Sequence, residues 1–521
     1  MPLLKTGPLL ALSFFAVFSL LALDSDLKVE HDSGVYIALG QSLVSGQGYS
    51  ATYLAGHPPH TRYPPVFPAF LAPLIGLIGY HVLAMKLLMV ALSMLTLYLL
   101  YVFFTDLAED LMAFLVVTFT ATSHGMLFYS QSIMAEIPYL CLSLLALFWV
   151  HRCSRRGEWS GRAMAMAVAL ISLAYLTRLI GLSLLLATVV YLVCDSPGRP
   201  EVKIRRAITL GGCAAIPAII WFLRNWWVGE SGGTAYASDF HLKTVYASPS
   251  VIDGVVKYLA GIRTNPAEYA LHTARVVFFY YPWVSRTVLP LLLALVIFGS
   301  FLWCAVRRRT ILEYYMLFYM GMLLLLPVEN PQRYLVPLIP FIWYYFFTGI
   351  SRLLAWLRGQ VLMHKPDYQG GVALATALLA LALLIVNATM AVRANVIDRG
   401  REGYYHVVGE DRYVSIVPWV KAHTSPDSVF MWAKPSLRFL WTERKAVGYP
   451  RTKSTEDALR SIRQAHVDYV VVDAFSDVTQ RLLRPVVEKY PEYFSLVYKD
   501  DVSEVYRVVT PDLNARPPSG G

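Results

Sequence analysis

The stretch EHDSGVYIALGQSLVSGQGYS, residues 30–50, is polar and interrupted by glycines, and it separates two strongly apolar parts of the chain. It opens with acidic residues, and the part after Asp32 has the composition of a short amphipathic helix. The chain of 521 residues is 56% hydrophobic and only 15% charged, whereas soluble domains carry about 25% charged residues. The sequence therefore predicts a polytopic membrane protein with a functional loop just outside its first span.

The apolar segments on both sides of this loop predict a mainly α membrane domain over residues 1–392. A helix that crosses a bilayer needs about 20 mostly apolar residues, and about eleven segments approach this pattern. They cover residues 8–23, 81–104, 111–129, 138–151, 162–176, 179–194, 208–228, 287–306, 311–328, 334–350 and 371–392. Residues 63–79 are equally apolar, but their prolines favour a kinked segment at the membrane surface.

The net charge of +10 comes from basic residues in short loops between the apolar segments. Examples are Arg152, Arg155, Arg156, Arg162, Arg199, Lys203, Arg205, Arg206, Arg307, Arg308 and Arg309. The positive-inside rule keeps such loops in the cytoplasm, so the basic balance reflects topology and no nucleic-acid partner is expected. The N-terminus is then cytoplasmic, and residues 24–80, 229–286 and the chain after 392 lie outside the plasma (inner) membrane. The acidic loop Thr105–Asp110 is an exception to the pattern.

The composition changes after residue 392. The segments DSVFMW, VDYVVVD, FSLVYKD and SEVYRVV are rich in β-branched and aromatic residues, which predicts strands. STEDALRSIRQAH begins with a cap residue followed by acids, and DVTQRLLRPVVEKY predicts a second helix interrupted by Pro485. We expect a small extracytoplasmic α/β domain over residues 393–510, followed by a disordered tail over 511–521.

Four motifs, taken in order along the chain, resemble the GT-C class of membrane glycosyltransferases. The first loop has Asp32, Tyr36, the turn GQGY at residues 46–49 and Pro64-Pro65. The later motifs are SQSIMAEIPYLCLSLLALF with Glu136, YLTRLIGL with Arg178, and ENPQRYLVPLIPF with Arg333. The likeness is to the bacterial branch related to protein O-mannosyltransferases and lipid A aminoarabinose transferase.

The resemblance implies transfer of a sugar from a polyprenyl-phosphate donor to a hydroxyl of a glycan, lipid or protein acceptor, in contact with membrane lipids. Such a displacement needs a base for the acceptor proton and cations for the departing phosphate. Asp32 is the expected catalytic base, and Glu136 stands where the family has a second acid. Guanidinium groups match phosphate geometry, so the donor-binding candidates include arginines. The substrate-binding candidates are Tyr36, His57, Arg62, Tyr63, Arg178, Arg275, Arg333 and Tyr334.

Structural alternatives exist for each charged candidate. Asp32 precedes a helix and is a good N-cap residue, and Glu136 before Pro138 suits the first turn of a helix. The arginines are equally suited to be loop charges, interfacial anchors or snorkelling residues. Asp24 and Asp26 are alternative bases.

The sequence also leaves the donor, the acceptor and the function class open. The family's acid-Lys pair before Pro-Pro is Arg62-Tyr63 here, and its Asp-Glu doublet is Asp32-Ser33. Both departures leave the sugar and acceptor undefined. No cofactor is implied and no metal ligand is assigned, although His31, His57 and His60 with Asp32 are an open alternative for a divalent metal. A transporter or lipid-carrier flippase, or a scaffold that binds a partner, would also carry such groups.

Overall fold

The computed structural model describes residues 2–27, 32–229, 266, 269–270, 272–273, 289–325, 331–361, 368–397, 410–449 and 454–509. Most of the predicted external segment 229–286 lies outside these residues, as do Arg275, His31 and the predicted tail 511–521.

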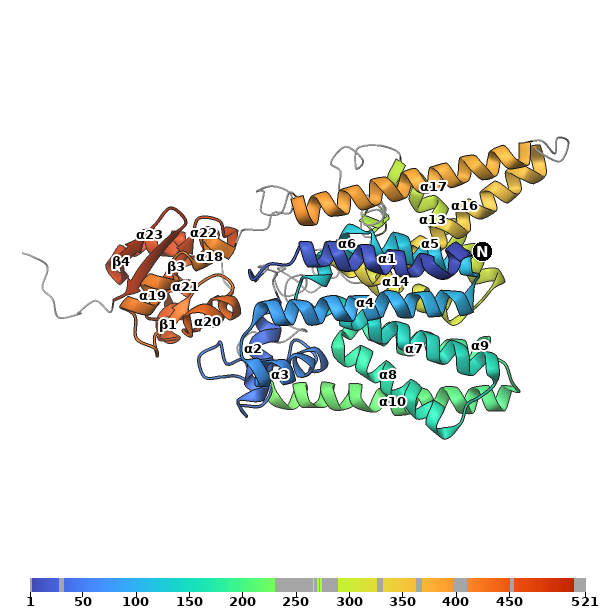
Figure 1. Ribbon diagram of the computed structural model, residues 1–521. Coiled ribbons are helices and arrows are strands. Elements are labelled where there is room, and N and C mark those ends of the chain that lie inside the picture. Colours follow the sequence, from blue (N-terminus) through green and yellow to red (C-terminus); the bar gives the residue numbers. More distant parts are fainter. Residues whose placement is uncertain are drawn as a thin grey trace, which may run out of the picture.

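A bundle of roughly aligned helices forms the larger part of the molecule, and a small domain lies beyond one end of it (Figure 1). The helices and 3-10 turns of the bundle are α1 (Pro2–Leu21), α2 (Ser33–Val44), α3 (Val66–Ile78), α4 (Val82–Leu107), α5 (Asp110–Ala121), α6 (His124–Ser130), α7 (Glu136–Arg156), α8 (Gly161–Thr177), η1 (Leu179–Gly181), α9 (Leu182–Cys194), α10 (Pro200–Val228), α13 (Leu289–Arg307), α14 (Ile311–Leu325), α15 (Pro331–Leu335), η4 (Val336–Leu338), α16 (Ile339–Val361) and α17 (Tyr368–Val392), which a π-helical turn continues over Arg393–Ile397.

All eleven predicted segments coincide with helices, but their lengths differ. Within the described residues, six helices are long and apolar enough to cross a membrane, and the bent pair α5–α6 raises this number to seven. The other apolar helical stretches, including Pro8–Leu21 of α1, have 10–17 residues. Helix α3 is one of them and contains Pro73, so residues 63–79 are not among the helices long enough to span, as predicted.

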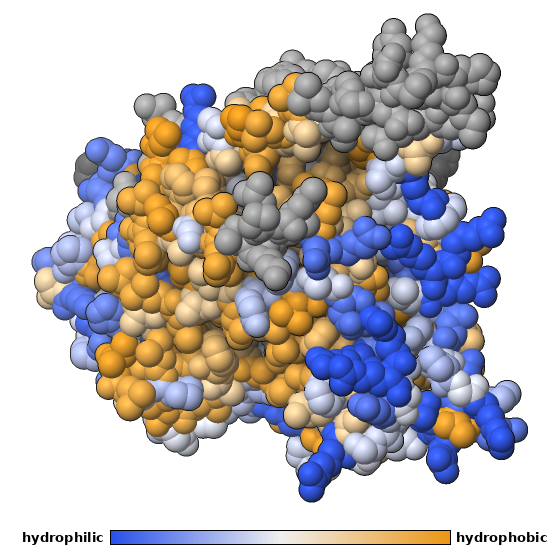
Figure 2. Space-filling view, turned by 45° about the vertical axis from the view of Figure 1, so that its right-hand side comes forward, coloured by the Kyte–Doolittle hydropathy of each residue, from blue (hydrophilic) through white to orange (hydrophobic). Residues whose placement is uncertain are grey.

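The two ends of the bundle differ in charge. The N-terminus lies at the end away from the small domain, and α7 and α10 place their basic ends there (Figure 1). In Figure 2 hydrophobic residues cover a broad area, and hydrophilic residues gather beside it. The acidic loop that departed from the charge pattern is neutralised locally, because Arg155 pairs with Asp106 at 2.8 Å.

The small domain contains a five-stranded mixed sheet in the order β2-β1-β3-β5-β4. Its elements are α18 (Glu410–Val414), α19 (Val417–His423), β1 (Val429–Met431), α20 (Pro435–Thr442), β2 (Lys445–Ala446), α21 (Thr455–Gln464), β3 (Tyr469–Asp473), α22 (Asp477–Leu482), α23 (Arg484–Lys489), η6 (Pro491–Tyr493), β4 (Phe494–Lys499) and β5 (Ser503–Val508). Side chains alternate between the faces of a strand, so Val470 and Val472 join one apolar cluster while Val471 joins the other. The four predicted strands are confirmed, and so is the helix break at Pro485.

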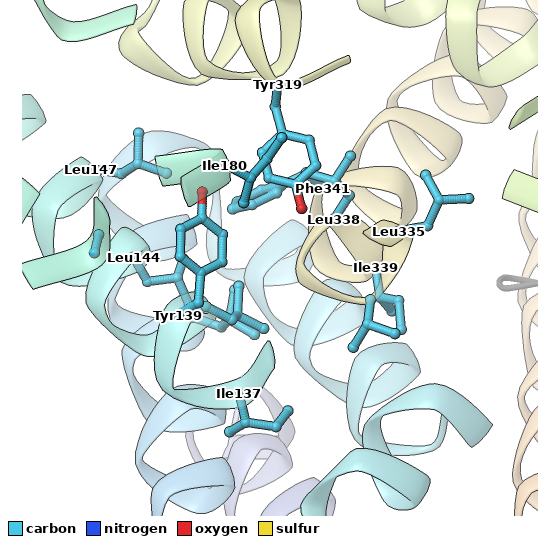
Figure 3. Packing of buried hydrophobic residues seen from close by; sticks show 14 of the residues in the cluster. Ile137, Tyr139, Leu144, Leu147, Ile180, Tyr319, Leu335, Leu338, Ile339 and Phe341 are labelled. Atoms are coloured by element: carbon cyan, nitrogen blue, oxygen red, sulfur yellow. The ribbon is translucent and has the colours of Figure 1, made fainter. Parts of the chain in front are cut away.

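An apolar cluster holds together the helix ends that carry three of the predicted site residues. Figure 3 shows this packing, in which α7, η1, α14, α15 and α16 meet. The labelled residues are Ile137, Tyr139, Leu144, Leu147, Ile180, Tyr319, Leu335, Leu338, Ile339 and Phe341. Protein interiors pack as densely as organic crystals, so the residues at these helix ends have little freedom to move.

Candidate active site

Glu136 lies between two arginines that come from different helices. It is the first residue of α7 and has no exposed surface. Arg178 follows the last residue of α8 and Arg333 lies in α15, and both guanidinium groups contact Glu136 Oε1. A buried carboxylate is strongly destabilising unless it is paired, so the two arginines offset the cost of burying Glu136. Glu136 Oε2 accepts no hydrogen bond within the described part of the chain.

Arg333 also contacts Asp32, which joins the two predicted catalytic acids. Its Nη1 donates to Asp32 Oδ2 at 2.5 Å, while its Nε donates to Glu136. The hydroxyl of Tyr63 donates to the other oxygen, Asp32 Oδ1. Asp32, Tyr63, Glu136, Arg178 and Arg333 form one hydrogen-bonded group, which we call the carboxylate–arginine cluster.

Asp32 is charged at neutral pH in this arrangement. Burial alone would raise its pKa, because only 7% of its surface is exposed. The charge of Arg333, the Tyr63 and Arg333 hydrogen bonds, and the charge of Arg62 together outweigh burial and lower the pKa. The helix-capping alternative is wrong for the side chain, because Asp32 makes no side-chain cap to α2.

Tyr63 packs against two other aromatic rings. Its ring lies 5.0 Å from that of Tyr36 and stacks on His60 at 5.5 Å, and Arg62 lies 5.4 Å from the ring centre. The backbone N–H of Tyr63 donates to His60 Nε2 at 3.0 Å, which requires a neutral imidazole. Burial, with the charges of Arg62 and Arg224, lowers the pKa of His60 to about 3, so the ring is neutral at physiological pH.

The end of α10 fixes the loop that contains His60. Arg224 donates to the carbonyl of His60 at 2.5 Å, and Asn225 donates to the carbonyl of Thr61 at 3.1 Å. The support by His60, Arg224 and Asn225 was not predicted from the sequence. The sequence signal for this support is weak, because Arg224 is equally consistent with a charged residue at the end of an apolar span.

The remaining predicted residues divide into those near the cluster and those apart from it. The guanidinium carbon of Arg178 lies 5.2 Å from the centre of the Tyr334 ring. The backbone carbonyl of Tyr334 accepts a hydrogen bond from the hydroxyl of Tyr319 at 2.9 Å. His57 has a left-handed backbone, and the charge that acts on it is that of Lys445 in the small domain. These features do not connect His57 to the carboxylate–arginine cluster, so its role in substrate binding stays a prediction.

Asp24 and Asp26, the alternative bases near the end of α1, both contact Lys86. The buried ammonium of Lys86, in the first turns of α4, pairs with Asp24 and donates to the carbonyl of Asp26 at 2.5 Å. This contact ties the end of α1 to the start of α4. Over the described ranges, no three histidine, cysteine or acidic residues are arranged to hold a metal ion.

Solved structures of membrane glycosyltransferases share the fold. ArnT from Cupriavidus metallidurans, in a crystal structure with undecaprenyl phosphate, superposes with a TM-score of 0.58. The match covers 96% of this chain and 98% of ArnT at 12% identity. The chain has the GT-C fold. The Archaeoglobus fulgidus oligosaccharyltransferase, solved with a tethered acceptor peptide, matches with a TM-score of 0.54 at 13% identity, over 98% of this chain and 75% of its own.

A third structural neighbour is the arabinofuranosyltransferase AftD from Mycobacteria. It has a TM-score of 0.51 at 13% identity, over 98% of this chain and 42% of its own. No protein-family model matches the chain, and no curated protein matches it in sequence. The comparisons thus confirm the predicted fold class, which is that of polytopic membrane proteins.

Proposed function

We propose that the protein is a membrane glycosyltransferase that moves a sugar from a polyprenyl-phosphate donor to an acceptor hydroxyl. The carboxylate–arginine cluster carries this proposal, because it combines a charged carboxylate with the cations that a lipid phosphate needs. The GT-C fold of the chain supports it, and ArnT was solved with undecaprenyl phosphate. The cluster residues lie at helix ends, whereas transporters place such groups in broken helices near mid-bilayer.

In the proposed reaction Asp32 takes the proton of the acceptor hydroxyl. The acceptor oxygen forms a bond to the anomeric carbon, and the bond from that carbon to the phosphate oxygen breaks. The polyprenyl phosphate leaves with the bonding electrons, and Arg178 and Arg333 balance its charge. A single displacement of this kind inverts the anomeric centre, so no covalent sugar–enzyme intermediate forms.

Arg333 couples donor binding to the strength of the base. It contacts both Asp32 and Glu136, and its contact lowers the pKa of Asp32. A donor phosphate that binds Arg333 competes with Asp32 for the same guanidinium. The Asp32 carboxylate then loses a stabilising contact and becomes a stronger base, so the donor should bind before the acceptor reacts.

The expected orientation places the cluster and the small domain outside the cytoplasm. The basic ends of the helices lie at the opposite end of the bundle, as the positive-inside rule requires for a cytoplasmic face (Figure 1). Polyprenyl-linked sugars on the outer leaflet would then reach Asp32 directly.

The proposal is tested with purified protein and undecaprenyl-phosphate-linked neutral hexoses, uronic acids and aminopentoses, in the presence of envelope extract as acceptor. Mass spectrometry follows consumption of each donor. We expect one donor class to be consumed by the wild-type protein and not by Asp32→Asn. Full activity of Asp32→Asn would refute its assignment as the base, and no consumption of any donor would refute the polyprenyl-phosphate donor class.

A further inference from the structure

Helix α20 of the small domain lies directly on the first turn of α2. A Cβ atom added at Gly34 would lie 2.9 Å from the backbone nitrogen of Leu437 and 2.9 Å from its Cδ2. Real Cβ contacts of this length do not occur, so the two backbones approach as closely as glycine allows. Leu437 is fully buried and belongs to the same apolar cluster as Tyr36 and Tyr63.

A second contact extends the sheet of the small domain into the first external loop. Leu54 forms a parallel bridge with Ala446 of the edge strand β2. The backbone N–H of Ala446 donates to Tyr53 at 3.0 Å, and that of Ala55 donates to Ala446 at 2.9 Å. Phe439 of α20 packs against the small apolar cluster that contains Tyr53 and Leu54.

These two contacts adjoin the two chain segments that meet at the proposed base. The first lies two residues after Asp32, and the second lies in the segment that leads to Tyr63. Asp32 and Tyr63 are 31 residues apart and are joined by a hydrogen bond. The small domain therefore contacts both halves of the loop that has to hold this pair together, and α20 faces α2 at the end of the bundle (Figure 1).

We propose that the C-terminal α/β domain positions the active site, and that Leu437 is a positioning residue which holds α2 so that Asp32 faces Arg333. This inference rests on the proposed glycosyltransferase function for its catalytic consequence. The docking itself is independent of that function. A displacement of a reacting group by about 1 Å can lower a rate about 100-fold, so the domain affects turnover without touching the substrate.

The test uses two full-length variants that remove equal numbers of carbon atoms from the small domain. Leu437→Ala removes the contact with α2. Ile462→Ala, in the buried face of α21, weakens the same domain within a separate apolar cluster. Hydrogen exchange of peptides from residues 33–44 reports whether α2 is loosened. The rate of donor consumption gives kcat and the donor KM.

We expect Leu437→Ala to speed exchange in α2 and to lower kcat about 10- to 100-fold with the donor KM nearly unchanged. Ile462→Ala should leave α2 exchange and kcat close to wild type. Normal exchange and normal kcat in Leu437→Ala would overturn the inference, and so would equal losses in both variants. Where Leu437→Ala does not fold, Leu437→Val takes its place. No consumption of any donor by the wild-type protein would instead refute the proposed function, and the exchange data would still decide the docking.

Discussion

Replacing Arg333 with methionine tests the charge balance of the cluster. Methionine has a similar length and no charge, so the variant removes the contact that Asp32 and Glu136 share. Glu136 keeps Arg178, whereas among the described residues Asp32 keeps the hydrogen bond from Tyr63 and the charge of Arg62. Breaking a buried ion pair by removing one partner costs about 3–5 kcal/mol, and we expect a loss of this size at neutral pH.

The loss should depend on pH in a defined direction. In the wild-type protein Arg333 lowers the pKa of Asp32 in the folded state. The charged carboxylate therefore stabilises the fold at any pH above the pKa that Asp32 has in the unfolded chain. This stabilisation is lost as the pH falls through the pKa of Asp32 in the folded protein. In Arg333→Met burial outweighs the remaining partners and raises the pKa of Asp32. The charged form then destabilises the fold at neutral pH, and protonation relieves this cost as pH falls.

The assay is thermal unfolding of detergent-purified protein at pH 7.5 and at pH 5, at one fixed scan rate because unfolding of such proteins is often irreversible. We expect Arg333→Met to unfold well below the wild type at pH 7.5, with a smaller difference at pH 5. Arg308→Met is the matched control, because Arg308 is exposed at the opposite end of the bundle and its guanidinium group donates a hydrogen bond to the hydroxyl of Tyr344. A difference that is equal at both pH values would refute the reasoning.

Three further predictions concern single side chains. Asp32→Asn should lower kcat by about 100- to 10,000-fold without affecting membrane insertion, and Asp26→Asn, in the same loop between α1 and α2, should stay near wild type in the donor-consumption assay; equal activities would contradict the choice of base. Tyr63→Phe removes a hydrogen bond that lowers the pKa of Asp32, so the acid limb of the pH–rate profile should move to higher pH. An unchanged acid limb would show that Tyr63 does not affect the pKa of the catalytic base. Lys86→Met removes the cation that pairs with Asp24 and should lower the unfolding temperature with little change in donor KM; a selective rise in donor KM would place Lys86 in the donor site instead.

The fold and much of the cluster could be predicted because their signals are local. Long apolar segments define helices whatever their partners are, and the order of four motifs along the chain indicated one fold class. Glu136, Arg178 and Arg333 were each recognised inside such a motif, and the structure brings them together. Arg275 lies outside the described residues, so its predicted role is untested.

The contacts between motifs could not be predicted in the same way. The residues around Asp32 are typical of a helix N-cap. Its carboxylate oxygens instead accept hydrogen bonds from Tyr63 and Arg333, which only the structure shows. The sequence contains no sign that Gly34 faces Leu437, because a glycine after Asp-Ser also suits a turn. The two-residue strand β2 is too short for a strand pattern, although it carries the contact with the first loop.

The central claim is that Asp32 and the arginines of the cluster form one site for a polyprenyl phosphate. Its most direct test is an experimental structure of the protein with bound undecaprenyl phosphate. We expect phosphate oxygens within hydrogen-bond distance of Arg178 or Arg333, with the contact between Arg333 and Asp32 lengthened or broken. A phosphate bound at another place in the bundle, with that contact intact, would contradict it.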